Sequence, residues 1–200
     1  MYKTLQIPPR LARKLSQMPL IAGRSPKVMR FADLYYDTPD MQLLKLEMVF
    51  RRRMQGRREI LSLSTMDENQ EWQWKPTPVP SGGFDFSALA SHPECHTLIA
   101  LQDQLRPIFS VVYQRRIWPD VPHSGILVEF SADLGQIKCG DATRPFCALR
   151  LKSTESGQDI SVLEKVCEEI SVALGIDSSL AAPVQTGYEM HRTHRTVRNS

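Results

Sequence analysis

Short stretches in which apolar and polar side chains alternate are the feature of this sequence that most restricts its fold. In CALRLKS, Leu149 and Leu151 alternate with Ala148, Arg150 and Lys152. Successive side chains of a strand point to opposite faces of a sheet, so this alternation predicts a strand with one buried face. The stretch ILSLST shows the same pattern. The other face of such a strand ordinarily meets water, so its residues need a further reason before a function is assigned to them.

More strands are predicted by runs of aromatic and β-branched residues that end at turn signals. These runs are VMRFADLYYD, VFRRRM, EWQWK, PIFSVVYQRRIW, GILVEFSADLG and QIKCG. VFRRRMQGRREILSLST is predicted to hold two strands around a turn at Gln55–Gly56. Helices are predicted at Leu11–Met18, at QLLKLEM, and most strongly at DISVLEKVCEEISVALG, where apolar residues recur at helical spacing. Many antiparallel strands with helices at the ends and in the middle predict an α+β fold.

Length and composition agree with a single globular domain. The chain has 200 residues, of which 42% are hydrophobic and 24% charged, which is ordinary for a globular protein. No apolar run approaches the ~20 residues that cross a bilayer, so we expect a soluble protein, most simply a cytoplasmic one. The four cysteines form no C-x-x-C pair, which argues against a zinc ribbon.

The basic residues are distributed unevenly. The formal net charge is only +3, but five arginines fall within eight residues, and the C-terminal HRTHRTVRNS is also basic. Basic clusters attract phosphate-bearing ligands, although a solvated face is the more frequent explanation. The five arginines are Arg51, Arg52, Arg53, Arg57 and Arg58.

Several motifs, taken in order, resemble a known family. LYYDTPDMQLLKLEMVFRRR resembles the signature of CYTH proteins, the triphosphate tunnel metalloenzymes, in which a tyrosine-rich strand, a D-T-P turn, a short helix and an R-x-R strand follow one another. LRPIFSVVYQRRIW, VEFSADLGQIKCG, RPFCALRLKS and TGYEMH resemble the family's later motifs. The resemblance implies a tunnel domain at residues 1–190, with a basic C-terminal tail at residues 191–200.

The family resemblance implies a closed eight-stranded antiparallel β-barrel whose tunnel binds a triphosphate, with flanking helices. Family members hold the phosphate chain with basic residues and one or two Mg²⁺ or Mn²⁺ ions with pairs of glutamates. Their activities include inorganic triphosphatase, thiamine triphosphatase and a class of adenylate cyclase. Such reactions depend mostly on positioning and on stabilisation of charge by cations.

The resemblance implies functional roles for only some of the residues in these motifs. It implies phosphate binding by Arg51 and Arg53, which match the R-x-R pair, and by Arg115, which precedes the motif tryptophan Trp118 by three residues. Glu129 matches the glutamate of a hairpin strand, and is the catalytic or metal-binding candidate if the chain is active. Asp133 and Gly135 match the turn of that hairpin, and the remaining metal candidates are Asp133 and Glu71.

The departures from the family pattern fall on its metal-binding and catalytic parts. The family opens with E-x-E-x-K, but MYKTLQIPP holds no acid. The later E-x-E aligns with Ala148 and Arg150, with Lys152 beyond it. The lysine that follows the R-x-R strand is replaced by Ser62 or Ser64, and the arginine of R-G-Y is Thr186.

These losses favour a protein that binds a triphosphate, a polyphosphate or a nucleotide without cleaving it. Divalent ions need several hard oxygen ligands, whereas Arg150 and Lys152 can donate charge-assisted hydrogen bonds to phosphate oxygens directly. A purely structural role, in which Arg150 pairs with Glu129 or Asp133, stays open. A partner-binding role stays open as well.

Two further functions remain as alternatives. One is a divergent metal-dependent triphosphatase that uses Glu129, Glu71 and Asp133 with Mg²⁺ or Mn²⁺. The other is an interaction protein whose basic segment, Arg52 with Arg57 and Arg58, contacts nucleic acid or an acidic partner. We rank this last because the segment lacks interleaved aromatic residues.

Overall fold

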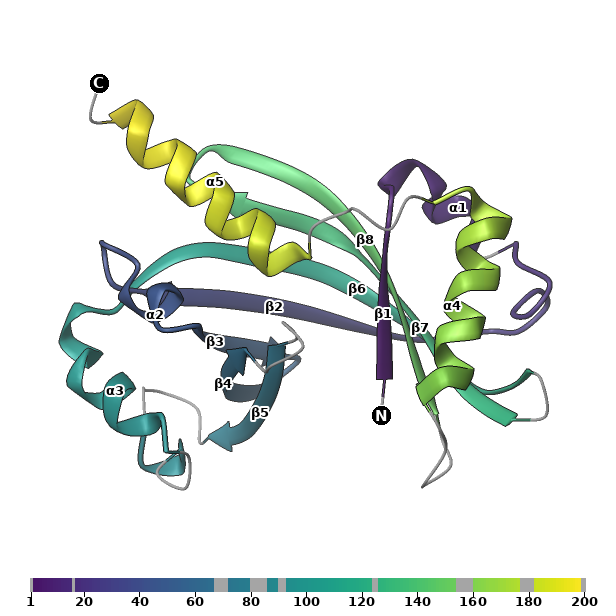
Figure 1. Ribbon diagram of the computed structural model, residues 1–200, viewed down its shortest axis with the longest axis horizontal. Coiled ribbons are helices and arrows are strands. Elements are labelled where there is room, and N and C mark those ends of the chain that lie inside the picture. Colours follow the sequence, from purple (N-terminus) through teal and green to yellow (C-terminus); the bar gives the residue numbers. More distant parts are fainter. Residues whose placement is uncertain are drawn as a thin grey trace. The chain divides into compact units, whose positions relative to one another are not determined.

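The computed structural model describes residues 2–15, 17–66, 72–79, 86–89, 93–123, 126–153, 160–176 and 182–198. The strands are β1 (Tyr2–Ile7), β2 (Lys27–Asp37), β3 (Met48–Gln55), β4 (Arg58–Met66), β5 (Trp72–Val79), β6 (Arg106–His123), β7 (Ile126–Cys139) and β8 (Ala142–Ser153) (Figure 1). The helices are α1 (Ala12–Leu15), α2 (Gln42–Lys45), α3 (Cys95–Ala100), α4 (Ile160–Leu174) and α5 (Pro183–Arg198). Short 3₁₀ turns lie at Pro9–Leu11, Phe86–Leu89 and Gln102–Gln104.

The strands form an antiparallel sheet in the order β1-β8-β7-β6-β2-β3-β4-β5. Together with the helices, this sheet confirms the predicted α+β class. β1 and β5 stand at the two ends of the order, and no pairing joins them within the described residues. The closed barrel predicted from the sequence is therefore not confirmed.

The chain divides into two compact units, which we describe separately. Unit 1 comprises Met1–Arg30, Tyr113–Ile137 and Thr143–Thr186, and unit 2 comprises Phe31–Val112, Lys138–Ala142 and Gly187–Ser200. The basic tail predicted from residue 191 falls in unit 2, where α5 continues to Arg198. The boundary at residue 190 stays a prediction. None of the described helices is long and apolar enough to cross a membrane.

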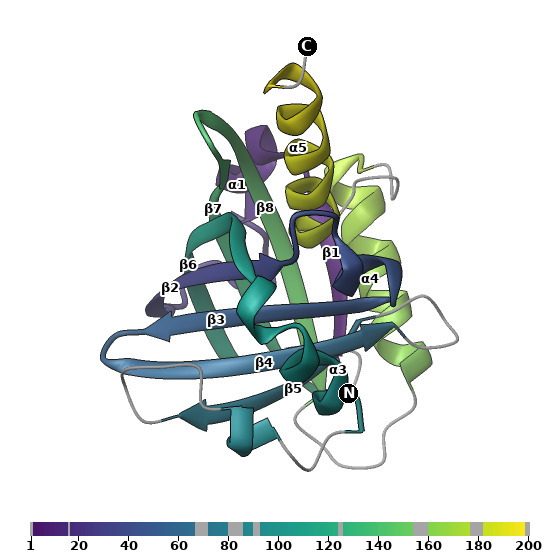
Figure 2. The same cartoon turned by 90° about the vertical axis from the view of Figure 1, so that its left-hand side faces the viewer.

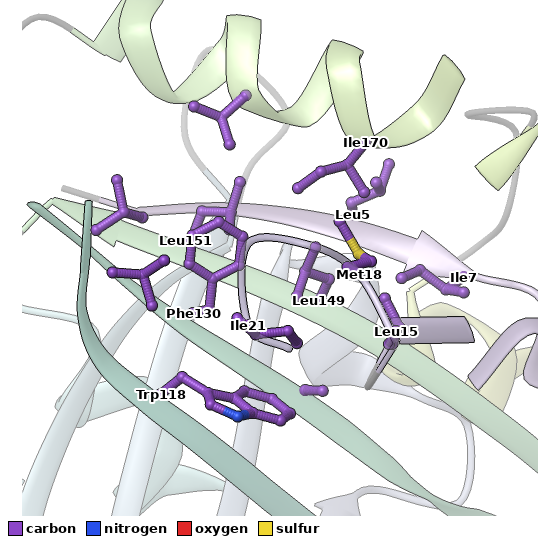
Figure 3. Packing of buried hydrophobic residues seen from close by; sticks show 14 of the residues in the cluster. Leu5, Ile7, Leu15, Met18, Ile21, Trp118, Phe130, Leu149, Leu151 and Ile170 are labelled. Carbon is purple, nitrogen blue, oxygen red and sulfur yellow. The ribbon is translucent and has the colours of Figure 1, made fainter. Parts of the chain in front are cut away.

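The core of unit 1 lies between α4 and one face of the sheet. Figure 3 shows Ile170 of α4 above Leu5 of β1 and above Leu149 and Leu151 of β8, and Phe130 of β7 completes this layer. The residues of this core alternate along β1 and β8, as CALRLKS predicted, because only every second side chain points toward the helix. The intervening polar residues of β1, β7 and β8 consequently lie on the opposite face.

The core of unit 2 lies on one face of β3 and β4. Leu61 and Leu63 of β4 are buried with Phe50 of β3, Leu43 of α2 and Leu98 of α3. Figure 2 shows β3, β4 and β5 side by side in chain order. The predicted turn between β3 and β4 is confirmed, and Gly56 takes the left-handed conformation there with φ of 61°. The alternating serines of β4 lie on the face opposite this core.

The D-T-P turn orders the start of α2 through a buried carboxylate. Asp37 is fully buried and accepts hydrogen bonds from the backbone N–H groups of Thr38 (2.7 Å), Leu43 (2.9 Å) and Leu44 (3.1 Å). The hydroxyl of Tyr188 in α5 donates a fourth bond at 3.3 Å. Burial raises the pKa of Asp37, and these donors act in the opposite direction. The motif residue Asp37 therefore serves the fold of unit 2.

The T-G-Y motif has a related structural role. A Cβ atom added at Gly187 would lie 2.3 Å from a ring carbon of Phe109, so only glycine permits this approach. The ring of Phe109 also contacts Tyr188 edge to face, with centroids 5.3 Å apart. Gly187 and Tyr188 thus dock α5 within unit 2.

We expect Asp37→Ala to lower the free energy of unfolding by about 1–3 kcal/mol, because it removes the acceptor of three backbone N–H groups. Urea denaturation measures this loss. Asp40→Ala is the matched control, since Asp40 belongs to the same turn but is exposed, and its effect should be clearly smaller. Equal losses in the two variants would contradict the role assigned to Asp37.

Three elements differ from the sequence predictions. The helix predicted at Leu11–Met18 is shorter, with α1 covering only Ala12–Leu15 after a 3₁₀ turn. ILVEFSADLG and QIKC form one continuous strand, β7, so the prediction of a turn at Asp133 and Gly135 is wrong. The chain reverses after Cys139 instead, where Gly140 has φ of 56°. Helix α5 was not predicted.

Candidate functional site

The predicted site residues occupy polar faces of strands in both units. Arg51 and Arg53 belong to unit 2. Unit 1 holds the other described candidates, which are Arg115, Glu129, Asp133, Arg150 and Lys152. Glu71 lies outside the described residues. Each unit is therefore considered by itself.

A buried carboxylate joins the two arginines of the R-x-R strand in unit 2. Asp33 of β2, which is 2% exposed, accepts hydrogen bonds from Nε (2.7 Å) and Nη2 (2.6 Å) of Arg53. Nη1 of Arg51 lies 3.4 Å from the same carboxylate. The guanidinium of Arg53 also lies over the ring of Phe31, 5.1 Å from its centroid. One aspartate thus partly neutralises two nearly buried guanidinium groups.

Tyr35 extends this cluster along β2. It lies opposite Arg51 in the β2–β3 pair, hydrogen-bonds to the Arg51 side chain, and stacks on Phe109 with centroids 4.4 Å apart. Burial raises the pKa of the Tyr35 phenol, so it remains protonated at neutral pH. The hydroxyl therefore supplies a neutral hydrogen-bonding group beside two cations.

Ser62 and Ser64 continue the same face onto β4. Ser62 lies directly opposite Arg51, and Ser64 lies opposite Val49. Residues that are directly opposite in an antiparallel pair share a face. We call this surface the polar face of unit 2, and its members are Asp33, Tyr35, Arg51, Arg53, Ser62 and Ser64.

Arg52 points to the other face of β3. It hydrogen-bonds through Nη2 to the buried carboxylate of Glu59 at 2.9 Å. Arg57 and Arg58 are exposed in and beside the hairpin turn. The basic segment considered for nucleic acid therefore loses Arg52 to an internal ion pair, which weakens that alternative.

Unit 1 contains a second arginine–aspartate pair with the same geometry. Arg115 of β6 donates from Nε and Nη2 to the two oxygens of Asp133 in β7, each at 2.6 Å. Its guanidinium lies 5.6 Å from the ring centroid of Tyr113. Such a two-pronged pair is strong and holds both side chains in place.

These residues do not fit a magnesium or manganese site. Both oxygens of Asp133 already accept from Arg115, and Glu129 is half-buried on the same strand. Across the described residues, no group of three or more His, Cys, Asp or Glu side chains could hold a metal ion. Because Mg²⁺ binds through several oxygen ligands, usually including carboxylates, we derive no step that uses a bound metal.

The face formed by β1 and β8 carries the clearest departure from the family pattern. Thr4 lies opposite Arg150 and Gln6 lies opposite Ala148, so these four residues share a face. Arg150 is half-buried and Lys152 at the strand end is exposed. Where the family resemblance implies a pair of glutamates, β8 has Ala148 and Arg150. We call Thr4, Gln6, Arg115, Glu129, Ser131, Asp133, Ala148, Arg150 and Lys152 the polar face of unit 1.

Cysteine chemistry is not indicated beside this face. Burial, with a further contribution from Asp133, raises the pKa of Cys147 to about 12. Its thiol therefore stays protonated at neutral pH and is a poor nucleophile. Cys147 instead packs in the core of unit 1.

Sequence reasoning missed Asp33 and Tyr35. Both lie in the predicted strand VMRFADLYYD at alternate positions with Asp37, which places the three on one face. Asp33 could have been found from the sequence, because arginines on a largely buried strand require a nearby carboxylate to neutralise their charge. Its pairing with Arg53 depends on the register of β2 against β3, which the sequence does not show.

Comparison with known proteins supports these assignments of the fold. The sequence pattern of the CYTH domain family matches residues 9–169. A search of curated proteins finds no match. A candidate adenylate cyclase from Bacillus halodurans has a TM-score of 0.58 at 14% identity, covering 90% of this chain and 92% of that chain.

Two further solved structures have comparable scores. A candidate adenylyl cyclase from Hippeastrum, described as having a dominant triphosphatase activity, has a TM-score of 0.57 at 15% identity, covering 94% of both chains. A Pyrococcus horikoshii protein has a TM-score of 0.51 at 14% identity, covering 88% of this chain and 90% of that chain. At such identities the likeness shows the fold alone. Because the family pattern matches most of its length, this chain belongs to the CYTH domain family.

Proposed function

We propose that this CYTH protein binds a compound with a triphosphate or polyphosphate chain through arginine and lysine side chains, without a divalent ion and without cleaving it. The observation that carries the proposal is the β1–β8 face, where Arg150 stands opposite Thr4 and Ala148 opposite Gln6. This face offers cationic and neutral groups where metal binding would need carboxylates.

The chemistry of the remaining groups fits a phosphate chain. Guanidinium groups bind phosphate oxygens with two parallel hydrogen bonds, and an ammonium group adds a point charge. In unit 1, Arg150 and Lys152 are the proposed ligands of the phosphates. Arg115 is a further proposed ligand, for which a phosphate would compete with Asp133.

In unit 2, Arg51 and Arg53 are the proposed phosphate ligands. They share Asp33, so the three groups leave a formal charge of +1. An incoming phosphate would compete with this carboxylate for the guanidinium groups.

A metal-dependent triphosphatase is the second candidate function. Family membership favours it, as does the triphosphatase activity named for the Hippeastrum protein. It would require Glu129, Asp133 and Glu71 to gather around Mg²⁺ or Mn²⁺. Release of orthophosphate from tripolyphosphate with either metal, lost in Glu129→Gln, would establish this function in place of the first.

Removal of divalent ions distinguishes the two functions. Isothermal titration of the protein with tripolyphosphate should show binding in EDTA. Mg²⁺ should leave the affinity unchanged or lower it, since the ion binds phosphates and neutralises the free ligand. Binding that appears only after Mg²⁺ is added would contradict the proposal.

A further inference from the structure

Two hydroxyl groups on the polar face of unit 2 are buried without a hydrogen-bond partner among the described residues. Ser62 is fully buried and Ser64 is 1% exposed, and within the described part of the chain neither Oγ atom has a hydrogen-bond partner. Buried polar atoms of native proteins nearly always have one, whether protein, water or ligand. A buried hydroxyl with no partner is destabilising, so two on one strand require an explanation.

The two serines lie on the face of β4 that carries Arg51, opposite the hydrophobic core of unit 2. Leu61 and Leu63, which alternate with them, pack into the core of unit 2 on the other side of β4. Ser62 lies directly opposite Arg51 in the register of β3 and β4. Side chains so placed have Cβ atoms about 5 Å apart. Ser62 therefore neighbours Arg51 on this face, and the guanidinium group of Arg51 reaches Asp33.

The electrostatic surroundings of these hydroxyls suit an anion. Arg51, Arg53 and Asp33 leave a formal charge of +1 on this face, and the Tyr35 hydroxyl adds a neutral polar group. Serine hydroxyls donate hydrogen bonds without adding charge. An oxyanion would satisfy both hydroxyls and would interact favourably with the cations at the same time.

We propose that Ser62 and Ser64 form, together with Arg51, a subsite for a phosphoryl group, in which both hydroxyls donate to its non-bridging oxygens. The ligand class rests on the proposed function, whereas the two serines are identified by their burial and their unmet hydrogen bonds. The subsite selects its ligand by hydrogen-bond geometry in addition to charge.

The test compares the double variant Ser62→Ala/Ser64→Ala with the wild type in two measurements. One is titration with tripolyphosphate in EDTA, and the other is the melting temperature of the free protein. Thr65→Val is the matched control, because Thr65 is the next residue of β4 and lies on the opposite face. Arg150→Ala is titrated in parallel to test the proposed function.

The subsite predicts at least about tenfold weaker binding by the double variant, since hydrogen bonds to a charged group are lost. It also predicts an unchanged or higher melting temperature, because unmet polar groups are removed, and wild-type affinity for Thr65→Val.

Wild-type affinity in the double variant, with weaker binding by Arg150→Ala, would overturn the subsite and leave the proposed function standing. A lower melting temperature of the free double variant would also overturn it, since the hydroxyls would then stabilise the fold. Absence of binding by the wild type would overturn both.

Discussion

Asp33→Ala is expected to lower the free energy of unfolding by about 3–5 kcal/mol, the cost typical of removing one partner from a buried ion pair. Asp33 is 2% exposed, and the side chains of Arg51 and Arg53 are only 10% and 14% exposed. Without the carboxylate, two guanidinium groups would remain away from water with their main counter-charge removed. Urea denaturation, with the slope checked for two-state behaviour, measures the loss.

Asp103→Ala is the control for this experiment, because Asp103 is an exposed aspartate of the same unit. Its effect should stay within about 0.5 kcal/mol. If Arg51 and Arg53 bind phosphate, saturating tripolyphosphate should raise the melting temperature of Asp33→Ala more than that of the wild type, since the ligand supplies the missing negative charge. A loss below about 1 kcal/mol would show that Asp33 is not the required counter-ion.

Arg150→Glu is expected to weaken the binding of tripolyphosphate in EDTA by at least about 100-fold. The substitution removes hydrogen bonds to a charged group, each of which contributes about 1.5–3 kcal/mol. It also places a like charge beside the phosphates, and at a separation of 4 Å this costs further energy. Isothermal titration at one fixed salt concentration measures the change.

Two further substitutions in β8 test whether the loss of affinity is specific to Arg150. Arg144→Glu changes the net charge equally but at an exposed position of β8, so its affinity should stay close to that of the wild type. Arg150→Lys keeps the positive charge but loses the two parallel hydrogen bonds of a guanidinium group. Its affinity should therefore lie between those of the wild type and Arg150→Glu. Equal weakening by Arg144→Glu and Arg150→Glu would show that only the overall charge matters, and would remove Arg150 from the site.

Much of the fold could be predicted because local patterns determine it. The alternation of Leu149 and Leu151 identified β8, and Gln55–Gly56 identified the β3–β4 hairpin. The continuous strand β7 was missed because Gly135 matched a turn motif, whereas beyond it the buried residues Ile137 and Cys139 alternate with exposed ones, as in a strand. Helix α5 was missed because it is mostly polar and docks through few side chains, among them Val184 and Tyr188.

The site was only partly predictable, because its geometry depends on contacts distant in sequence. The basic residues of the R-x-R strand and of β8 could be named from their motifs. The pairings of Arg53 with Asp33 and of Arg115 with Asp133 join residues 20 and 18 positions apart, and they depend on strand register. Asp133 was predicted as a metal ligand, yet its carboxylate is bound to an arginine in the structure.

The central claim is that cationic side chains bind the phosphate chain directly, without a metal and without cleavage. Phosphorus-31 NMR of tripolyphosphate mixed with an equimolar amount of the protein, first in EDTA and then with excess Mg²⁺, tests it most directly. The account predicts shifted or broadened tripolyphosphate signals already in EDTA, and no orthophosphate signal in either condition. Unchanged signals in EDTA, followed by growing orthophosphate once Mg²⁺ is present, would contradict it.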